Sequence, residues 1–511
     1  MKVEMTVNDF LDRAATVYPD RIALVDEPDQ PATPLQTLTY AEFADVKRQM
    51  GVAMDEMKIP MGGRVAMVSH NSARLQTCFY GVSGNGRVFV PINFRLSADE
   101  VRYIVDHSGA EALLVDPELA EALDDVECER KWIIGDESDA AWLGRDGEPV
   151  RWEPSESDIA SINYTSGTTA RPKGVEQTHR ARWTNAVTFG WHTGVSDRDV
   201  YLHTLPMFHC DGWGMHHAVT GMGGKHVQLR KIDGTEILRR VEEHGVTLMC
   251  GAPAVVASVL DAAKGWDGEV PGKGTVRVVV AGAPPPTATI EAIETELGWE
   301  FIQIYGLTET APLLTINRCR PEWDDLSPAD RASRLARQGT PAIGVEMKVS
   351  ENGEFLARSN NVMKGYWHNE EATSEALDGG WFHTGDGGVV DDEGHYQILD
   401  RKKDVIISGG ENVSSIEVED TLFSHPGVSE AAVIGVPHEK WGETVKALVV
   451  RTDGSSATEQ DIIDHCREKI AHYKCPTSVE FREELARTAT GKLQKFKLRE
   501  PYWAHMEKSV N

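Results

Sequence analysis

Short apolar segments that end in glycine or proline alternate with amphipathic helical stretches through the middle of the chain. The apolar runs cover residues 246–250, 276–280 and 301–304. Between them, apolar residues recur with helical spacing over 237–244 and 290–297. This alternation predicts βαβ units, whose loops gather at the carboxyl ends of parallel strands, where open α/β sheets bind ligands. We therefore expect an α/β fold with a ligand site at that edge.

The C-terminal part of the chain has a different pattern. Ser414 followed by Glu417 is typical of a capping box that opens a helix. Strand-like runs follow at 431–436 and 445–450, and a further helix is expected over 461–470. The pattern predicts a small α+β domain.

The length of 511 residues exceeds what one hydrophobic core usually organises, so at least two domains are expected. We predict a large N-terminal domain over residues 1–400 with βαβ-type sheets. A small, mobile α+β domain would follow over residues 401–511, with a hinge near Lys403.

Charge and composition exclude several classes of function. The 80 acidic residues outnumber the 52 basic ones, and the formal net charge of -28 disfavours nucleic acid and anionic lipid as partners. No apolar run approaches the roughly 20 residues that span a bilayer. The seven cysteines are scattered and include no Cys-x-x-Cys pair, so neither a disulfide framework nor a zinc site is indicated. Acidic residues near the N-terminus argue against a secretory signal, and a cytoplasmic protein is expected.

A run of hydroxyl side chains and glycines over residues 164–175 is the strongest local signal. Backbone N–H groups and hydroxyls of such a loop wrap phosphate oxygens, and Lys173 adds a point charge. The run is not a Walker loop, because five residues separate Gly167 from Lys173. A polar surface loop is the alternative. The candidate phosphate ligands are Thr165, Ser166, Gly167, Thr168, Thr169 and Lys173.

This run resembles the phosphate loop of the adenylate-forming superfamily, which includes acyl-CoA synthetases, aryl-CoA ligases, luciferases and peptide-synthetase adenylation domains. Further motifs follow in that family's order over nearly the whole chain. The resemblance implies ATP and coenzyme A as substrates and Mg²⁺ as the metal. It implies that Glu309, together with Thr168, holds the Mg²⁺ ion, for which oxygen ligands are suited.

The segment 305–310 resembles the second core motif of this family. The resemblance places Tyr305 beside adenine, Thr308 at the α-phosphate and Asp386 on the ribose hydroxyls. It adds further nucleotide contacts from Gly282, Ala283, Gly306 and Arg401.

The C-terminal motifs resemble the mobile parts of these enzymes. The resemblance makes Lys403 the pivot of a domain rotation and Lys492 the catalytic lysine of adenylation. The loop expected to line the coenzyme A tunnel consists of Ser408, Gly409, Gly410 and Glu411.

The segment 208–213 lies where the superfamily begins to line the acyl pocket, with Phe208, Asp211 and Trp213 as candidate wall residues. His209, a candidate catalytic residue, stands where enzymes for α-amino acids carry an aspartate, so a plain carboxylic acid is favoured. Asp211 could complicate that inference, or it could be a turn residue. The pattern resembles the branch for medium-chain, branched or aryl acids, and aromatic walls are also expected from Trp183 and Trp191, with Met215 beside them.

Taken together, the resemblance implies an AMP-forming acyl-CoA synthetase that converts an apolar carboxylic acid, ATP and coenzyme A to acyl-CoA, AMP and pyrophosphate. Three alternatives stay open. The acyl group could load a carrier protein. Ala170, where the family has Gly or Ser, could weaken adenylation and leave mainly thioester formation from acyl-AMP. The chain could also be a non-catalytic scaffold. Its oligomeric state is open, and a homodimer is one possibility.

Overall fold

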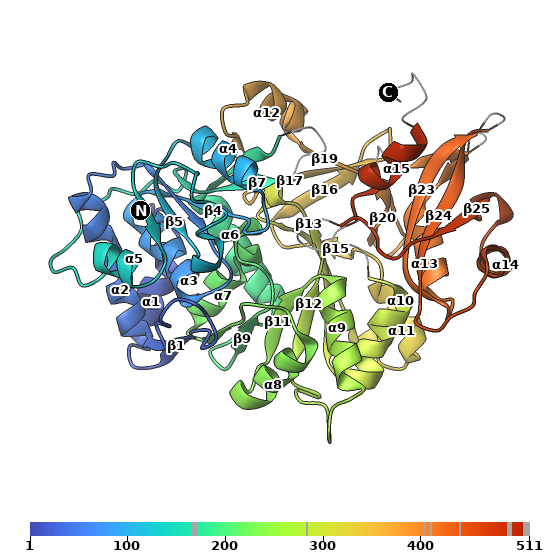
Figure 1. Cartoon of the computed structure of the whole chain (residues 1–511), viewed down its shortest axis with the longest axis horizontal. Coiled ribbons are helices and arrows are strands. Elements are labelled where there is room, and N and C mark those ends of the chain that lie inside the picture. Colours follow the sequence, from blue (N-terminus) through green and yellow to red (C-terminus); the bar gives the residue numbers. More distant parts are fainter. Residues whose placement is uncertain are drawn as a thin grey trace.

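The computed structural model describes residues 1–165, 171–282, 285–401, 404–408, 411–438, 441–487 and 493–503, without the side chains of Asp400, Arg401 and Asn412. A large N-terminal part carries three sheets, and a smaller C-terminal part with its own sheet lies beside it (Figure 1). The predicted α/β class, with a separate α+β C-terminal domain, is confirmed.

A nine-stranded sheet forms the centre of the N-terminal part, and its six middle strands are parallel. In spatial order the strands are β15 (Thr340–Pro341), β14 (Leu313–Arg318), β13 (Glu300–Gly306), β12 (Arg277–Val280), β11 (Leu248–Gly251), β9 (Val200–His203), β10 (Lys225–Gln228), β1 (Ile22–Val25) and β2 (Thr37–Thr39). The three apolar runs identified in the sequence are β11, β12 and β13, which are neighbours in the sheet.

The predicted helices between these strands are confirmed, with one change of geometry. The first is α8 (Gly234–His244), which begins where the Asp233 side chain accepts a hydrogen bond from Glu236 N at 2.8 Å. It ends at Gly245, whose φ of +64° is left-handed. The second begins as α10 (Thr287–Ala292) and continues as a π-helical turn over Ile293–Leu297.

Further helices cover this sheet and its neighbours (Figure 1). They are α1 (Asn8–Val17), α2 (Tyr40–Glu56), α3 (Ala73–Gly81), α4 (Ala98–Ser108), α5 (Asp136–Trp142), α6 (His179–Thr193), α7 (Met215–Met222), α9 (Pro253–Ala263), α11 (Pro328–Leu335) and α12 (Glu370–Ala376).

Two more sheets complete the N-terminal part. The seven-stranded sheet has the order β18 (Gly365–Tyr366), β8 (Lys173–Thr178), β7 (Ile159–Thr165), β4 (Val88–Ile92), β3 (Arg64–Val68), β5 (Ala110–Val115) and β6 (Lys131–Ile133). The four-stranded antiparallel sheet has the order β16 (Val345–Val349), β17 (Glu354–Ser359), β19 (Phe382–Val390) and β20 (Tyr396–Arg401).

The C-terminal part is the predicted mixture of strands and helices. Its strands are β22 (Glu411–Val413), β21 (Ile406–Ser408), β24 (Gly442–Arg451), β23 (Val428–His438) and β25 (Ser478–Phe481). Its helices are α13 (Ser415–Phe423), α14 (Glu459–Lys469) and α15 (Lys495–Trp503). The two strand-like runs lie in β23 and β24, and the expected helix is α14.

The start of α13 corrects one expectation. Ser414 caps the helix and accepts from Glu417 N at 3.3 Å, as predicted. The expected return contact from the Glu417 carboxylate gives way to a bond with Lys474 Nζ at 2.7 Å. The Lys474 ammonium group competes well for this carboxylate because it adds the attraction of a full positive charge, which a backbone N–H lacks.

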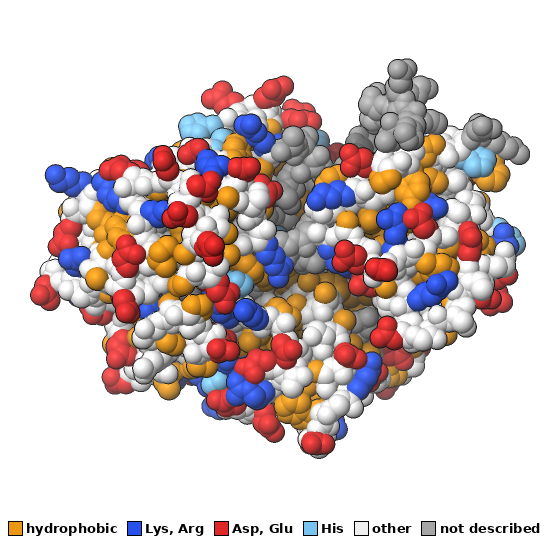
Figure 2. Space-filling view, viewed as in Figure 1, with side chains coloured by type: hydrophobic (Ala, Val, Ile, Leu, Met, Phe, Trp, Pro, Cys, Tyr) orange, Lys and Arg blue, Asp and Glu red, His pale blue; other side chains and the backbone are white. Residues whose placement is uncertain are grey.

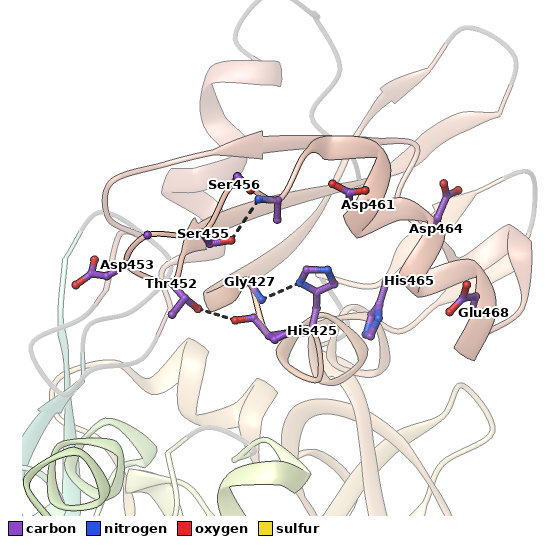
Figure 3. A pocket seen from close by; sticks show the side chains of 13 residues that line it. His425, Gly427, Thr452, Asp453, Ser455, Ser456, Asp461, Asp464, His465 and Glu468 are labelled. Atoms are coloured by element: carbon purple, nitrogen blue, oxygen red, sulfur yellow. Dashed lines mark hydrogen bonds between the residues drawn. The ribbon is translucent and has the colours of Figure 1, made fainter. Parts of the chain in front are cut away.

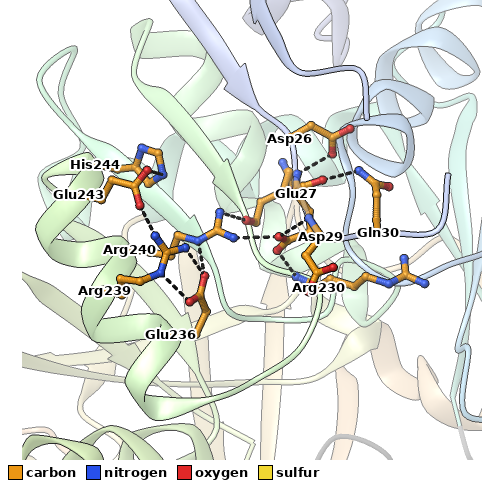
Figure 4. A network of polar contacts seen from close by, with 11 residues as sticks. Asp26, Glu27, Asp29, Gln30, Arg230, Glu236, Arg239, Arg240, Glu243 and His244 are labelled. Carbon is orange, nitrogen blue, oxygen red and sulfur yellow. Dashed lines mark hydrogen bonds and ion pairs between the residues drawn. The ribbon is translucent and has the colours of Figure 1, made fainter. Parts of the chain in front are cut away.

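Buried ion pairs join the segments that follow strands β1, β5 and β10 to their neighbours. Glu27 follows β1 and pairs with Arg240 of α8 at 2.8 Å, with both side chains buried (Figure 4). Arg230 follows β10 and donates two hydrogen bonds to Asp116, which follows β5, at 2.9 and 2.6 Å. Because breaking one partner leaves an uncompensated buried charge, such pairs fix the position of neighbouring elements.

The surface and the thiols agree with the composition. Acidic side chains are spread among basic ones over the face seen in Figure 2. All seven cysteines lie in described segments and are free thiols. No helix in the described segments is long and apolar enough to cross a membrane.

Candidate active site

The turn after β13 carries the second core motif. Gly306 is the last residue of β13, and a Cβ atom built on it would lie 1.7 Å from the carbonyl oxygen of Pro312. Only glycine fits this close approach of two backbone segments. The glycine therefore lets the chain fold back at Pro312 and places the segment from Thr308 to Thr310 beside the end of the strand.

Two predicted nucleotide residues meet at this end of the sheet. The Tyr305 hydroxyl donates a hydrogen bond to Oδ2 of Asp386 at 2.8 Å, and both residues are buried. Asp386 on β19 is the cross-strand partner of Arg401 on β20. The tertiary structure thus gathers Tyr305, Asp386 and the backbone of Arg401, although 81 residues separate the first two.

The hydroxyl-rich run connects two antiparallel strands. Thr165 ends β7, Lys173 begins β8, and the two residues are paired across the hairpin. Their position places the base of the predicted phosphate loop at the end of β7. Ser166, Gly167, Thr168, Thr169 and Ala170 lie outside the described residues.

Glu309 and Lys173 are brought together by a residue that the sequence did not single out. The Tyr366 hydroxyl donates to Oε1 of Glu309 at 2.8 Å, and Lys173 Nζ lies 4.7 Å from the centre of the same ring. Burial, followed by the negative charge of Glu309, raises the pKa of Tyr366 well above its usual value, so the phenol stays a donor. Tyr366 was missed because it lies 57 residues from Glu309 in a short Gly-Tyr-Trp run with no spacing signal.

The Glu309 centre fits a hard divalent cation. Its carboxylate is partly exposed, and the Tyr366 hydroxyl orients it from one side. Gln177 donates to the carbonyl oxygen of the neighbouring Thr308 at 2.6 Å, which fixes the backbone there. An oriented carboxylate with solvent access is the type of ligand that Mg²⁺ takes while it keeps several of its waters.

The segment expected to line the acyl pocket adopts an unusual turn. Residues 210–214 all have a left-handed φ, between +49° and +73°. Three of them carry side chains, and each such residue costs about 1–2 kcal/mol in this conformation. Trp213 is buried beside Met215 and Leu205 in one apolar cluster, and Phe208 packs on the ring of Phe94.

Asp211, in the same turn, lies in a buried ion pair. Arg182 of α6 approaches its Oδ2 at 2.8 Å, and only 1% of each residue is exposed. The sequence left open that Asp211 could act as the counter-charge for a substrate ammonium group. That interpretation is wrong, because the carboxylate already pairs with a guanidinium group.

Two of the expected aromatic walls lie elsewhere. Trp191 is 75% exposed, and the Trp183 indole nitrogen donates to Asp9 at 2.9 Å. Helix α6 directs Arg182 and Asn185 to the interior, which leaves Trp191 on the solvent side. Trp183 is partly buried and packs against Phe10 of the N-terminal core. His209 precedes the left-handed turn and is partly exposed.

Other predicted residues are not joined to this centre by the contacts of the described residues. Gly282 lies in the loop after β12 and has a φ of +94°. Ser408 pairs with Glu411 and Gly442, both in the C-terminal part. The predicted residues Ala283, Lys403, Gly409, Gly410 and Lys492, and the side chain of Arg401, lie outside what the structure describes.

An open groove of about 710 Å³ lies on the C-terminal part, away from the predicted residues (Figure 3). It runs between the turn at His425 and Gly427, the loop 452–457 and α14. Asp461, Asp464 and Glu468 of α14 face it, so it is an acidic surface that does not suit phosphates.

Comparison with known families agrees with the fold. The profile of the AMP-binding enzymes matches residues 11–367, and the profile of the AMP-binding enzyme C-terminal domain matches residues 417–492. The chain therefore belongs to the AMP-binding enzyme family.

Its relatives within this family include CoA ligases. A 4-hydroxybutyrate–CoA ligase of Metallosphaera sedula is 37% identical, over 96% of this chain and 93% of the relative. A 2-methylpropanoate–CoA ligase of Humulus lupulus is 36% identical, over 96% and 94%. A peroxisomal benzoate–CoA ligase of Arabidopsis thaliana is 34% identical, over 98% and 93%.

Solved structures share the whole architecture. The anthranilate CoA ligase AuaEII in complex with anthranoyl-AMP has a TM-score of 0.86 and 28% identity, over 98% of both chains. The o-succinylbenzoate CoA synthetase MenE of Bacillus subtilis with ATP and magnesium has a TM-score of 0.82 and 28% identity, over 96% of this chain and 99% of that one.

Proposed function

We propose that this enzyme is an AMP-forming acyl-CoA ligase for a monocarboxylic acid whose acyl part is apolar and carries no further charge. The observation that carries the proposal is the meeting of Tyr305 with Asp386, and of Lys173, Tyr366 and Glu309, at the strand ends of a chain whose relatives are CoA ligases. The first set suits a nucleoside, and the second suits a polyphosphate with a hard cation.

The reaction takes place in two steps. The substrate carboxylate attacks the α-phosphorus of ATP, and pyrophosphate leaves. Lys492 and the loop that begins at Thr165 stabilise the negative charge that builds at phosphorus. The thiol of coenzyme A then attacks the carbonyl carbon of the acyl-adenylate, and AMP leaves.

Each described residue has a part in positioning these groups. Tyr305 borders the base, and Asp386 accepts hydrogen bonds from the ribose hydroxyls. Glu309 would hold Mg²⁺, which neutralises charge on the phosphates when bound. Thr308 would contact the α-phosphate, and His209 would act as a catalytic residue beside the acyl pocket.

The small domain supplies the second half of the site. We propose that residues 401–511 rotate about Lys403, which withdraws Lys492 and brings the loop from Ser408 to Glu411 to the acyl-adenylate. One cleft then hosts both half-reactions in turn.

The acid is proposed to be apolar because of the pocket wall. Trp213, Met215 and Leu205 are buried together, and the Asp211 carboxylate is neutralised by Arg182. A free α-amino acid would lose the hydration of its ammonium group without gaining a counter-charge. Each unburied methylene of a small acid such as acetate forfeits about 0.8 kcal/mol. Relatives are named as ligases of acids as different as acetate and benzoate. The size of the acid that this enzyme prefers must therefore be measured by assay.

The comparisons do not favour the alternatives of carrier-protein loading or a chain limited to the thioester step. The test is release of AMP from ATP with a panel of monocarboxylic acids, followed by coenzyme A consumption. We expect AMP and acyl-CoA in equal amounts. Acyl-AMP formation without coenzyme A consumption would contradict the proposal. Lys492→Ala should abolish acyl-AMP formation and spare thioester formation from synthetic acyl-AMP.

The proposed location of the enzyme is the cytoplasm. Several plant relatives are named as peroxisomal, and fractionation of the source cells would distinguish the two compartments. A homodimer is one possible assembly, which sedimentation would measure.

A further inference from the structure

The buried pair of Arg182 and Asp211 has no part in the chemistry proposed above. Arg182 lies on α6, and Asp211 lies in the left-handed turn 210–214. The pair distance is 2.8 Å, and each residue is 1% exposed. A buried pair of charges is a poor means of stabilising a fold, since an apolar pair of similar volume does as well. We therefore expect the pair to fix the position of the turn 210–214 relative to α6.

Arg182 contacts the turn through both terminal nitrogens of its guanidinium group. One donates to the carbonyl oxygen of Cys210 at 3.3 Å, and the other forms the ion pair with the Asp211 carboxylate. Three residues later on the same helix, Asn185 Nδ2 donates to the carbonyl oxygen of Trp213 at 2.9 Å. Helix α6 therefore contacts the turn both at its start and near its end.

The same pair is anchored to the strand that leads to the phosphate loop. Ser161 and Asn163 of β7 donate to the two carboxylate oxygens of Asp211, at 2.6 and 2.8 Å. Arg182 also donates to the Ser161 hydroxyl at 3.1 Å and to the Asn163 amide oxygen. The four side chains form one network between α6, β7 and the turn.

The network has a mechanical consequence for the pocket wall. A run of left-handed residues with side chains is unfavourable by itself and persists only where its surroundings impose it. Trp213 stands in this run, so the direction of its ring depends on the contacts that hold Cys210 and Asp211. Gly214 closes the run, where a Cβ atom would lie 2.6 Å from Asn185 Nδ2.

We propose that the Arg182–Asp211 pair is the positioning device that sets acid selectivity by fixing the turn that carries Trp213. The inference rests on the proposed function, in which this turn is the wall of the acyl pocket. In this proposal the pair contacts neither ATP nor the reacting carboxylate. It acts through Trp213, so its loss alters the choice between acids and leaves the use of ATP unchanged.

The decisive variant is Arg182→Lys, which keeps the positive charge. A single ammonium group cannot reproduce the planar fork that reaches Cys210, Asp211 and Asn163 together. The matched control is Arg240→Lys, which changes the similarly buried pair of Arg240 with Glu27 (Figure 4). Arg240 also contacts Glu236 and Gln228, and none of these residues belongs to the turn. For each protein, kcat/KM is measured for benzoate, 2-methylpropanoate and acetate, together with the KM for ATP in acid-dependent pyrophosphate exchange.

We expect Arg182→Lys to change the ratio of kcat/KM between the largest and smallest acids by at least about fivefold. The KM for ATP should change by less than about twofold, and Arg240→Lys should lower the melting temperature without changing the ratio. A uniform fall for all three acids would overturn the proposal.

Two further variants protect the test against a failure to fold. Asp211→Asn keeps the side-chain shape, and Arg182→Met combined with Asp211→Asn removes both charges and leaves no buried ion unpaired. An altered acid ratio in either folded variant supports the proposal, and failure of all three to fold would show a purely structural role and overturn it. If the wild type forms no acyl-CoA from any acid, the proposed function itself fails, and this outcome is separate from an unaltered ratio in an active enzyme.

Discussion

The hydroxyl of Tyr366 donates a 2.8 Å hydrogen bond to Oε1 of Glu309, and the same ring carries Lys173 Nζ on its face. This places a phenol between the candidate metal ligand and the candidate phosphate ligand. β18 pairs with β8 in the same sheet, with Tyr366 opposite Val175, so the contact is built into the strand register.

Tyr366→Phe removes the hydrogen bond that orients Glu309 and keeps the aromatic ring in place. A hydrogen bond to a charged group contributes about 1.5–3 kcal/mol, so we expect the Mg²⁺ concentration for half-maximal adenylation to rise about tenfold. Mg²⁺ titration of pyrophosphate exchange measures this. Tyr40→Phe is the control, because Tyr40 donates to Gly224 O in a different buried region. An unchanged Mg²⁺ dependence in Tyr366→Phe would contradict the assigned role.

Asp386→Asn should impair nucleotide binding more than acid binding. The carboxylate accepts from Tyr305 and is proposed to accept from ribose, and an amide loses the charge-assisted part of these bonds. We expect the KM for ATP to rise about tenfold and the KM for the acid to change less than about twofold. Asp26→Asn serves as a control for the loss of a buried, hydrogen-bonded carboxylate elsewhere. Equal changes in both KM values would argue for general disruption.

Gly306→Ala should be poorly tolerated. The added methyl group would meet the Pro312 carbonyl oxygen at 1.7 Å, so one backbone segment must move. We expect a loss of at least about 2 kcal/mol in the free energy of unfolding, and loss of adenylation, because the segment that carries Glu309 moves with it. Gly265→Ala is the matched control, since its nearest neighbour would be 3.8 Å away. Denaturant unfolding compares the two variants, and equal stabilities would refute the packing argument.

Acidification should destabilise the N-terminal part through its buried histidines. Burial lowers the pKa of His226 to about 3 and that of His179 to about 4. The unfolded chain binds these protons near pH 6.5, whereas the folded protein does not, so stability is complete above that pH and falls as the pH decreases towards 4. Each histidine contributes a slope of about 1.4 kcal/mol per pH unit within this window.

Urea unfolding between pH 7 and pH 4.5 measures this slope. His226→Gln should reduce the slope by about one proton, while it lowers stability at pH 7 through the loss of the contacts with His203 and Thr220. A slope identical to that of the wild type would show that His226 does not titrate differently in the folded and unfolded chains.

The sequence by itself determined the parts whose signals are local. The alternation of apolar runs and helical stretches predicted β11, β12 and β13 with the helices between them, because side-chain periodicity is a property of a short segment. The candidate residues Tyr305, Glu309 and Asp386 were identified from the resemblance of short local runs to the motifs of a known family. The glycine at 306 also stood in the predicted motif, and the structure supplies its reason in the contact with Pro312.

The tertiary structure alone decided which distant side chains meet. Tyr366 reaches Glu309 because β18 pairs with β8, and strand pairing between segments far apart leaves no mark on either segment. Asp211 becomes the partner of Arg182, and Trp191 is exposed, because the orientation of α6 against β7 fixes which of its faces is buried. Such contacts depend on how elements pack, and packing is a property of the whole chain rather than of any local run of residues.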